Sequence, residues 1–315
     1  MNTSLDKMLG IDYPVLMAPM FLISNEAMTI AALEAGITAA IPALNYRTID
    51  ELKAAIHSIR SKTDKPFGIN LIVNKSNPKY KSQLAAVVAA KVDFIITSLG
   101  SPKEVIDACK PAGIKVFCDV VNLEYARKVE ALGADGVIAV NNRAGGHSGN
   151  QSEELLIAEL VNHLQIPVIS AGGITSKQDV DRVIKLGAAG VSVGTVFIAT
   201  QEAPVSEEYK QALVEYGEKD VVWTDKMSGS PLTVINTPYL KKVGTKASFF
   251  ERLLLKNKWL KKYVKLIIAL RGVNKIRKSA KGATYKTVWV AGPSIESIQG
   301  ISRVKEVVKK LISAA

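Results

Sequence analysis

Eight short apolar runs recur along the first two thirds of this 315-residue chain, and each is separated from the next by enough sequence for a helix. Nearly continuous apolar sequence is typical of parallel strands that are covered on both faces. The spacing shows neither a reversal nor the pattern of a second domain, so it favours an α/β fold of the (β/α)8 barrel type over a doubly wound sheet. The predicted strands are 14–20, 37–43, 67–72, 94–99, 115–120, 136–141, 167–171 and 190–197.

Signals for helix ends fall between these runs. The stretch from Thr48 to Glu51 has the spacing of a capping box and predicts a helix over 49–61. Ser101 and Pro102 predict the start of a later helix, and Ser176 predicts one over 177–186. Glycine is preferred just after a helix because it adopts the left-handed conformation without strain. Four glycines follow the predicted helices in this way: Gly36, Gly113, Gly133 and Gly187.

The excess positive charge lies in one late segment. The chain has a net charge of +12, but residues 241–286 hold fifteen Lys/Arg and one acid, so the remainder carries −2. We expect residues 1–203 and 288–315 to form the barrel, and 204–287 to form a basic, mainly helical insertion between strand eight and the last helix. Apolar residues recur there at helical spacing among lysines, which predicts a basic amphipathic helix. They are Phe249, Phe250, Leu253, Leu260, Val264 and Ile267.

Two interpretations of this insertion stay open. One is a lid packed over the mouth of the barrel, with its lysines in solvent. The other is a cationic face that attracts an acidic partner, such as an acyl carrier protein, coenzyme A, the phosphates of NAD(P)H or an anionic membrane surface. No recognised nucleic-acid-binding motif accompanies the charge, so nucleic acid is not expected as a partner.

The two cysteines, Cys109 and Cys118, are too few for a disulfide scaffold and lack the spacing of zinc ligands, so no metal site is predicted. Residues 1–10 lack the apolar stretch of a signal peptide. The most apolar later stretch, 253–270, is interrupted by lysines, whereas a membrane span needs ~20 mostly apolar residues. These features predict a cytoplasmic protein.

Groups suited to binding or catalysis follow six of the predicted strands. In a (β/α)8 barrel the loops after the strands meet on one rim, where the chemistry lies. Glycines after strands seven and eight leave backbone N–H groups free to hold a phosphate, and a threonine hydroxyl adds a donor. A flavin-free phosphosugar isomerase or lyase would use the same glycines, so they do not identify the ligand alone. The six groups are Pro19-Met20, Asn70, Asp119, Gly145-Gly146-His147, Gly172-Gly173 and Gly194-Thr195.

Several motifs occur in the order found in a known family. The chain resembles the nitronate monooxygenase, or 2-nitropropane dioxygenase, family, which also contains NAD(P)H-dependent quinone reductases and FMN-dependent enoyl-acyl-carrier-protein reductases. The likeness covers about 1–203 and 288–315. It rests on Met17-Ala18-Pro19-Met20, Gly68-Ile69-Asn70, Ala144-Gly145-Gly146-His147-Ser148-Gly149, Ala171-Gly172-Gly173-Ile174, Val193-Gly194-Thr195-Val196-Phe197 and Ala291-Gly292-Pro293-Ser294.

The resemblance implies that FMN is the cofactor. It places the phosphate at Gly172, Gly173, Gly194 and Thr195, next to Ala171. It places the flavin ring against the backbone of Ala18, Pro19 and Met20, with Asn70, Gly145 and Gly146 beside it. Backbone this close to the ring can tune its electronics, while the flavin itself carries the redox chemistry.

His147 is the residue to which the resemblance assigns the chemistry. It implies a base for the α-proton of a nitroalkane, or a group that polarises or protonates a substrate oxygen. A histidine also has the one side chain whose ordinary pKa lies near neutral pH. His57 and His163 lie in helical patterns without glycine loops and are expected to be structural. Asp119 is either a buried hydrogen-bonding group or a flavin contact.

The sequence therefore predicts an FMN-dependent oxidoreductase that passes electrons or hydride from NAD(P)H through FMN to a quinone-like or enoyl acceptor. Nitronate oxidation with O2 is the close alternative. Arg143 stands where many members of the family carry an acid, and Val196 where many carry an arginine. These differences bear on the substrate. A homodimer is a further expectation.

Overall fold

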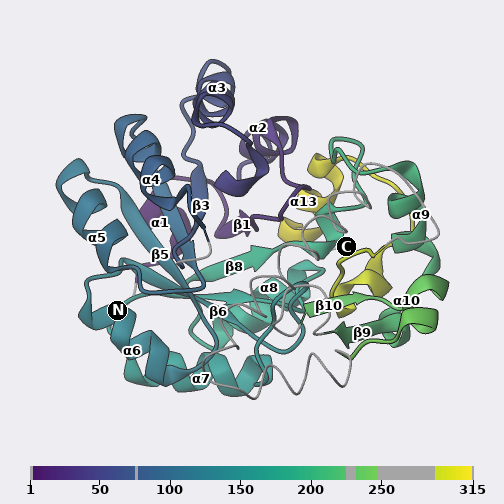
Figure 1. Cartoon of the computed structure of the whole chain (residues 1–315). Coiled ribbons are helices and arrows are strands. Elements are labelled where there is room, and N and C mark those ends of the chain that lie inside the picture. Colours follow the sequence, from purple (N-terminus) through teal and green to yellow (C-terminus); the bar gives the residue numbers. More distant parts are fainter. Residues whose placement is uncertain (1–2, 75–76, 225–231, 247–287, 314–315) are drawn as a thin grey trace, which may run out of the picture.

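The computed structural model describes residues 3–74, 77–224, 232–246 and 288–313. Its eight parallel strands pair in chain order, and β1 also pairs with β8, which closes the sheet into the predicted barrel (Figure 1). The strands are β1 (Val15–Met17), β2 (Thr38–Pro42), β3 (Gly68–Ile72), β4 (Phe94–Ser98), β5 (Lys115–Val120), β6 (Gly136–Val140), β7 (Val168–Ala171) and β8 (Gly190–Val193).

Helices alternate with these strands and surround the barrel (Figure 1). The predicted capping box at Thr48 forms, because its side chain accepts the N–H of Glu51 and the Glu51 side chain reaches back. Ser176, predicted only to precede a helix, forms a capping box with Asp179 as well. The surrounding helices are α2 (Glu26–Glu34), α3 (Ile49–Arg60), α4 (Tyr80–Ala89), α5 (Lys103–Cys109), α6 (Leu123–Ala131), α7 (Glu153–His163), α8 (Lys177–Lys185) and α13 (Val304–Ile312).

Large aromatic side chains fill the barrel interior. Phe94 and Phe117 meet edge to face with ring centroids 5.5 Å apart, and both are fully buried. Gly68 makes room for them, since a Cβ there would lie 2.2 Å from the Phe94 ring. The short helix α1 (Leu5–Leu9) closes the amino-terminal end of the barrel, where Leu5 belongs to the same cluster. The interior is therefore a packed core, so a ligand must bind at the other end.

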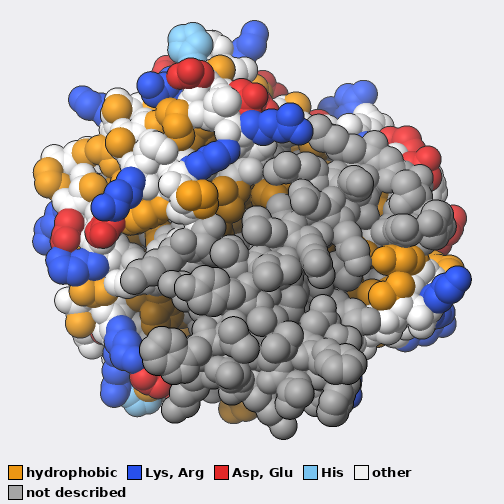
Figure 2. Space-filling view, in the orientation of Figure 1, with side chains coloured by type: hydrophobic (Ala, Val, Ile, Leu, Met, Phe, Trp, Pro, Cys, Tyr) orange, Lys and Arg blue, Asp and Glu red, His pale blue; other side chains and the backbone are white. Residues whose placement is uncertain are grey.

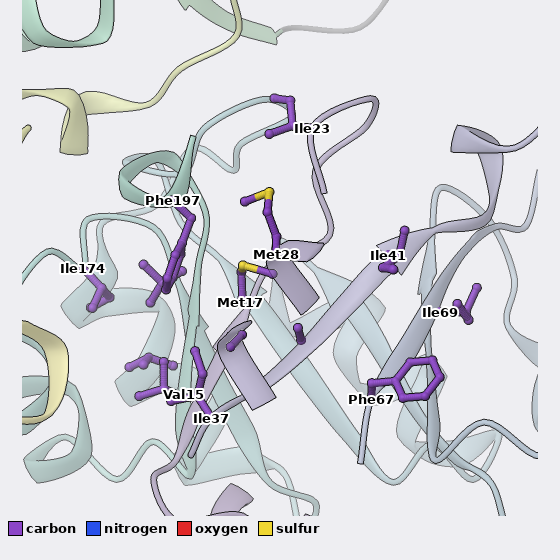
Figure 3. Close-up of a cluster of buried hydrophobic side chains, with 14 of the residues drawn as sticks. Val15, Met17, Ile23, Met28, Ile37, Ile41, Phe67, Ile69, Ile174 and Phe197 are labelled. Atoms are coloured by element: carbon purple, nitrogen blue, oxygen red, sulfur yellow. The ribbon is translucent and has the colours of Figure 1, made fainter. Parts of the chain in front are cut away.

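A second core lies between the strands and their helices. Figure 3 shows part of it, where Met17 of β1, Ile41 of β2 and Met28 of α2 lie among other buried side chains. Successive residues of a strand point to opposite faces, so Leu16 of β1 lies in the inner core and the next residue, Met17, in the outer one. Ile69 and Leu71, for example, belong to this outer core.

Strands one and eight end earlier than the sequence predicted. The apolar run of strand one continues to Met20, but β1 ends at Met17, just before Pro19, which has no N–H for a sheet. The run of strand eight continues to Phe197, but β8 ends at Val193 and Thr195–Phe197 forms a 3-10 helix, η3. Hydrophobicity alone did not distinguish a buried strand from a buried turn of helix.

The region after β8 contains both helices and a small sheet. Its described elements are α9 (Glu207–Glu215), the antiparallel pair β9 (Val221–Thr224) and β10 (Leu232–Ile235), and α10 (Pro238–Val243). The sequence analysis predicted a mainly helical insertion and did not anticipate this sheet. The basic amphipathic helix predicted over 249–267 lies outside the described residues. The chain returns to the barrel with α13, which packs against α2 and α8.

Surface charge on the described part of the molecule is mixed. Figure 2 shows Lys/Arg and Asp/Glu side chains interspersed over one face. This agrees with the near balance of charge outside 241–286. Among the described residues no helix is both long and apolar enough to cross a membrane.

Candidate active site

The carboxyl ends of β7 and β8 present bare peptide groups. Gly172 and Gly173 both have positive φ, at 115° and 81°, and Gly194 follows β8 directly. Among the described residues, no protein group accepts a hydrogen bond from the N–H of Gly173, Gly194 or Thr195. Gly173 and Gly194 are partly open to solvent, and Thr195 is buried beside them. An anion requires free donors of this kind, so these residues fit a phosphate.

Asn141, just after β6, fixes the glycine loop against this cradle. Its side-chain amide donates to the carbonyl of Gly172 at 2.9 Å, and its Oδ1 accepts the N–H of Arg143 at 2.8 Å. Asn141 is buried, and a Cβ on Gly172 would lie 2.3 Å from its Oδ1. The close approach explains why glycine is required at 172. The sequence analysis did not single out Asn141, although a polar residue that ends an apolar strand was a usable signal.

The same loop packs directly on the end of β8. A Cβ on Gly145 would lie 2.8 Å from Oγ1 of Thr195 and 3.0 Å from the backbone nitrogen of Gly292. Thr195 Oγ1 accepts the N–H of Gly292 at 3.0 Å, so its own hydrogen is left to donate elsewhere. The phosphate-sized cradle and the loop that carries His147 are therefore one packed unit.

Thr233 of β10 holds the glycine loop from the other side. Its hydroxyl accepts the N–H of Gly146 at 2.8 Å, and its backbone N–H donates to the carbonyl of Gly146 at 2.9 Å. The Thr233 hydroxyl also lies 3.4 Å from the carbonyl oxygen of Ala144. Thr233 is buried. Sequence reasoning missed this residue, since no local pattern indicates a contact between positions 87 residues apart.

His147 follows this anchored segment. Its residue surface is exposed, yet burial of its loop among protein atoms lowers the pKa of His147 from 6.5. A pKa below 6.5 leaves the imidazole mostly neutral at pH 7. The next residue, Ser148, has a buried hydroxyl for which the described chain provides no hydrogen-bond partner. A buried polar atom without a partner is uncommon and often marks a binding or catalytic position.

Arg143 extends along the cradle toward η4 (Glu218–Asp220). A Cβ on Gly173 would lie 3.3 Å from its Nε, and its guanidinium makes two hydrogen bonds with Glu218, at 2.8 and 3.0 Å. Both side chains are about half exposed, so solvent weakens the pair. Pairing with Glu218 raises the pKa of Arg143 further, so the group stays charged.

The segment after β1 uses its backbone donors internally. The N–H of Ala18 donates to Val193, and that of Met20 donates to Ser24 Oγ at 2.9 Å. Pro19 has no N–H. The predicted flavin contact of this segment would therefore not use free N–H groups of Ala18, Pro19 or Met20. Gly194 lies beside it, since a Cβ there would be 3.6 Å from both Ala18 Cβ and Met20 Sδ.

On the opposite side of the barrel, three polar residues form a chain of hydrogen bonds. The Asn70 amide donates to Ser98 Oγ at 2.8 Å, and the Ser98 hydroxyl donates to Asp119 Oδ2 at 2.5 Å. Burial raises the pKa of Asp119 to about 6. Ser98 was not selected from the sequence, although it also ends an apolar strand.

The two remaining histidines lie on helices away from these loops. His57 is on α3, and His163 is on α7, where its Nδ1 bonds the carbonyl of Glu159 at 2.7 Å. Within the described chain, no cluster of three His, Cys, Asp or Glu side chains is placed to hold a metal ion.

Comparison with known proteins identifies related sequences. A family model described as nitronate monooxygenase matches residues 2–314. A 5-hydroxy-7a-methyl-1-oxo-octahydro-1H-indene-4-carboxyl-CoA dehydrogenase from Mycobacterium tuberculosis is 31% identical over 79% of this chain and 71% of its own length. The dehydrogenase of the same name from Rhodococcus jostii is also 31% identical, and the match spans 66% of that protein, just under two thirds. A probable nitronate monooxygenase from Staphylococcus haemolyticus is 29% identical over 76% of this chain and 80% of its own.

Solved structures agree in fold. FabK from Thermotoga maritima superposes with a TM-score of 0.85 at 29% identity, covering 99% of this chain and 95% of its own. A nitroalkane oxidase from Streptomyces ansochromogenes gives a TM-score of 0.81 at 23% identity, covering 98% and 96%.

Proposed function

Because this chain belongs to the nitronate monooxygenase family, a family of flavin enzymes, we propose that it uses FMN to pass electrons or hydride from NAD(P)H to a quinone-like or enoyl acceptor. The chain is an oxidoreductase. We propose three further points: that the cofactor is FMN, that the reductant is NAD(P)H, and that the acceptor is a quinone-like or enoyl compound.

One observation carries it: the His147 loop and the phosphate-sized cradle are packed against each other. Gly145 lies against Thr195, and the carbonyl of Gly172 is bound by Asn141, which also holds the start of the glycine loop. A phosphate held at the cradle would therefore fix the rest of its molecule beside His147. This arrangement supports a phosphate-bearing cofactor whose reactive part lies at the mouth of the barrel.

The residues fit FMN in their chemistry. The free N–H groups of Gly173, Gly194 and Thr195 would hold its phosphate. Asn70 and Gly145-Gly146 would lie beside its ring. When bound, FMN supplies the redox chemistry that no protein side chain here can perform. Gly172 sets the shape of the cradle through its contact with Asn141.

His147 would accept or donate the proton in the reaction. A neutral imidazole can take a proton from a substrate carbon or accept a hydrogen bond from a protonated group. Desolvation keeps His147 neutral at pH 7, so it is ready to act as a base. The hydrogen bonds between Thr233 and the backbone of Ala144 and Gly146 hold the loop and so orient the imidazole.

The relatives support two classes of substrate. The carboxyl-CoA dehydrogenases are 31% identical to this chain and favour an acceptor or donor carried on a thioester. The nitronate monooxygenase relatives, at 29% identity, favour the alternative in which an alkyl nitronate is oxidised by O2. Membership of the family disfavours a flavin-free phosphosugar isomerase or lyase.

Spectroscopy and assays would test this proposal. The purified protein should show the visible absorbance of bound flavin, and anaerobic NADH or NADPH should bleach it within the time of turnover. Rapid NAD(P)H oxidation that depends on a quinone or enoyl thioester supports the main proposal. Nitronate-dependent O2 uptake without NAD(P)H would select the alternative, and a colourless protein that does not take up FMN would contradict both.

Three further features complete the proposal. We propose that 204–287 is a unit added to the barrel formed by 1–203 and 288–315, and that its basic residues attract an acidic partner such as an acyl carrier protein, coenzyme A or an anionic membrane surface. Lys→Glu changes at 258, 261 and 262 should then weaken activity with an acidic partner, most clearly at low salt.

A cytoplasmic location is supported by two buried cysteines that form no disulfide. A homodimer stays part of the proposal, to be tested by the molecular mass in solution.

A further inference from the structure

Three neighbouring strands carry inward-facing polar residues toward the carboxyl-terminal end of the barrel. Side chains alternate between the two faces of a strand, so residues two apart share a face. Ile96 of β4 lies in the interior core, which puts Ser98 on the inner side. Phe117 of β5 does the same for Asp119. On β3, Ile69 and Leu71 lie in the outer core, which leaves Asn70 between them facing inward. The three residues therefore lie above the packed core on the side of the mouth formed by β3, β4 and β5.

The direction of the hydrogen bonds among them is determined by chemistry. The carbonyl of Ile96 can only accept, so the group 3.2 Å from it must be the amide nitrogen of Asn70. The same nitrogen donates to Ser98 Oγ, so both amide hydrogens are used. Ser98 must then send its own hydrogen to a different acceptor, and Asp119 Oδ2 provides it at 2.5 Å.

This order leaves Asn70 Oδ1 as a free acceptor. Among the described residues, no group donates a hydrogen bond to it. Asn70 is buried, so a rotation of its amide would place Oδ1 against the carbonyl of Ile96 and lose two bonds. The carboxyl of half-buried Asp119 has Ser98 as its side-chain partner.

We propose that Asp119 is a positioning residue that acts through Ser98 to present Asn70 Oδ1 as the acceptor for an imide N–H of the bound isoalloxazine ring. This inference rests on the proposed FMN function and assigns a role to two residues, Ser98 and Asp119, that act without touching the ring. Asn70 makes the contact, and the other two keep its amide in the one orientation that offers an oxygen.

A double-mutant cycle tests the relay with FMN affinity as the readout, measured by quenching of flavin fluorescence in apoprotein. One net hydrogen bond corresponds to roughly three- to tenfold in affinity, so Ser98→Ala and Asp119→Ala should each weaken FMN binding by about that factor. Because both act on one amide, the double variant should be no weaker than the worse single variant. In an Asn70→Ala background, Asp119→Ala should have no further effect.

Two variants separate orientation from general damage. Asp119→Asn keeps an oxygen that can accept from Ser98 and should retain most of the affinity. Asp107→Ala, an exposed acid on α5 paired with Lys103, should bind FMN like the unaltered protein. Circular dichroism and thermal melting would identify any variant that fails to fold.

The relay would be overturned by additive losses in the double variant, or by a loss from Asp119→Ala that persists when Asn70 is absent. An Asp119→Asn variant as weak as Asp119→Ala would also contradict it. If the unaltered protein does not bind FMN, the proposed function fails instead, so the two failures are distinguishable.

Discussion

At the residue scale, burial shifts the pKa values of two ionisable groups at the mouth of the barrel so that their neutral forms are favoured. It lowers the pKa of His147 from 6.5 and raises that of Asp119 from 3.8 to about 6. The base is therefore neutral at pH 7, whereas Asp119 is ionised there and completes the bonds to Ser98 and Asn70.

We predict that the lowered pKa of His147 sets the acidic limb of the activity profile. The neutral ring is lost only as pH falls below 6.5 through the lowered value, so kcat/KM should decline there. His147→Gln should reduce kcat/KM by about 10²- to 10⁴-fold and remove this limb. His163→Gln should retain kcat/KM and the acidic limb, because among the described residues that ring bonds Glu159 of its own helix. The limb should also survive in Asp119→Asn; its disappearance there would assign it to Asp119 instead.

We also predict that Asp119 makes stability depend on pH. Its folded-state pKa of about 6 lies above the ordinary 3.8, so its favourable contribution is complete below 3.8 and is lost as pH rises through about 6. Asp119→Asn does not ionise. Its melting temperature relative to the unaltered protein should therefore rise between about pH 5 and about pH 8. An equal difference at both pH values would show that Asp119 is not held in a desolvated site. Cys118 and Tyr125, which interact with Asp119, have raised pKa values and stay neutral across this range.

At the element scale, local sequence signals predicted the helices and strands but did not predict the contacts between residues far apart in the sequence. The capping box at Thr48 predicted the start of α3, because its bonds join residues three positions apart. The eight apolar runs predicted the eight strands, since both faces of a parallel strand are buried. The anchoring of Gly146 by Thr233 could not be predicted in this way. It depends on β10, whose pairing partner in the small sheet and whose contact with the loop are both set by tertiary packing.

We predict that Thr233 controls the His147 loop. Thr233→Val keeps the shape of the side chain but leaves the partly buried N–H of Gly146 without its acceptor, which costs about 1 kcal/mol or more. That cost falls on the loop, so kcat/KM should drop by about tenfold or more while FMN affinity changes less, because the proposed cradle belongs to β7 and β8. Thr233→Ser keeps the hydroxyl and should restore most of the activity. Equal losses in the Ser and Val variants would indicate that packing, rather than the hydroxyl, matters.

At the scale of the whole molecule, the barrel is closed by its two ends. β1 pairs with β8, and α13, the last helix, packs against both α2 and α8. One face of α13 is buried, through Val304, Val307, Val308 and Leu311, while Lys309 and Lys310 are exposed. The candidate site depends on this closure, because its elements come from β1, β3 and β6 to β8 and from the returning segment at Gly292. No single stretch of sequence contains the site.

We therefore predict that a change in α13 destabilises the site at a distance. Leu311 is buried at 1% exposure, and Leu311→Ala should lower the free energy of unfolding by about 2–5 kcal/mol in urea titration. Lys310→Ala lies on the exposed face of the same helix and should change it by no more than about 0.5 kcal/mol. The Leu311 variant should release FMN at a lower urea concentration than the Lys310 variant. Both residues are more than a hundred positions from the cradle in the sequence. If both variants unfold together with the unaltered protein, α13 is not part of the cooperative barrel. Release of FMN well before unfolding in the Leu311 variant would instead show that the cradle opens locally.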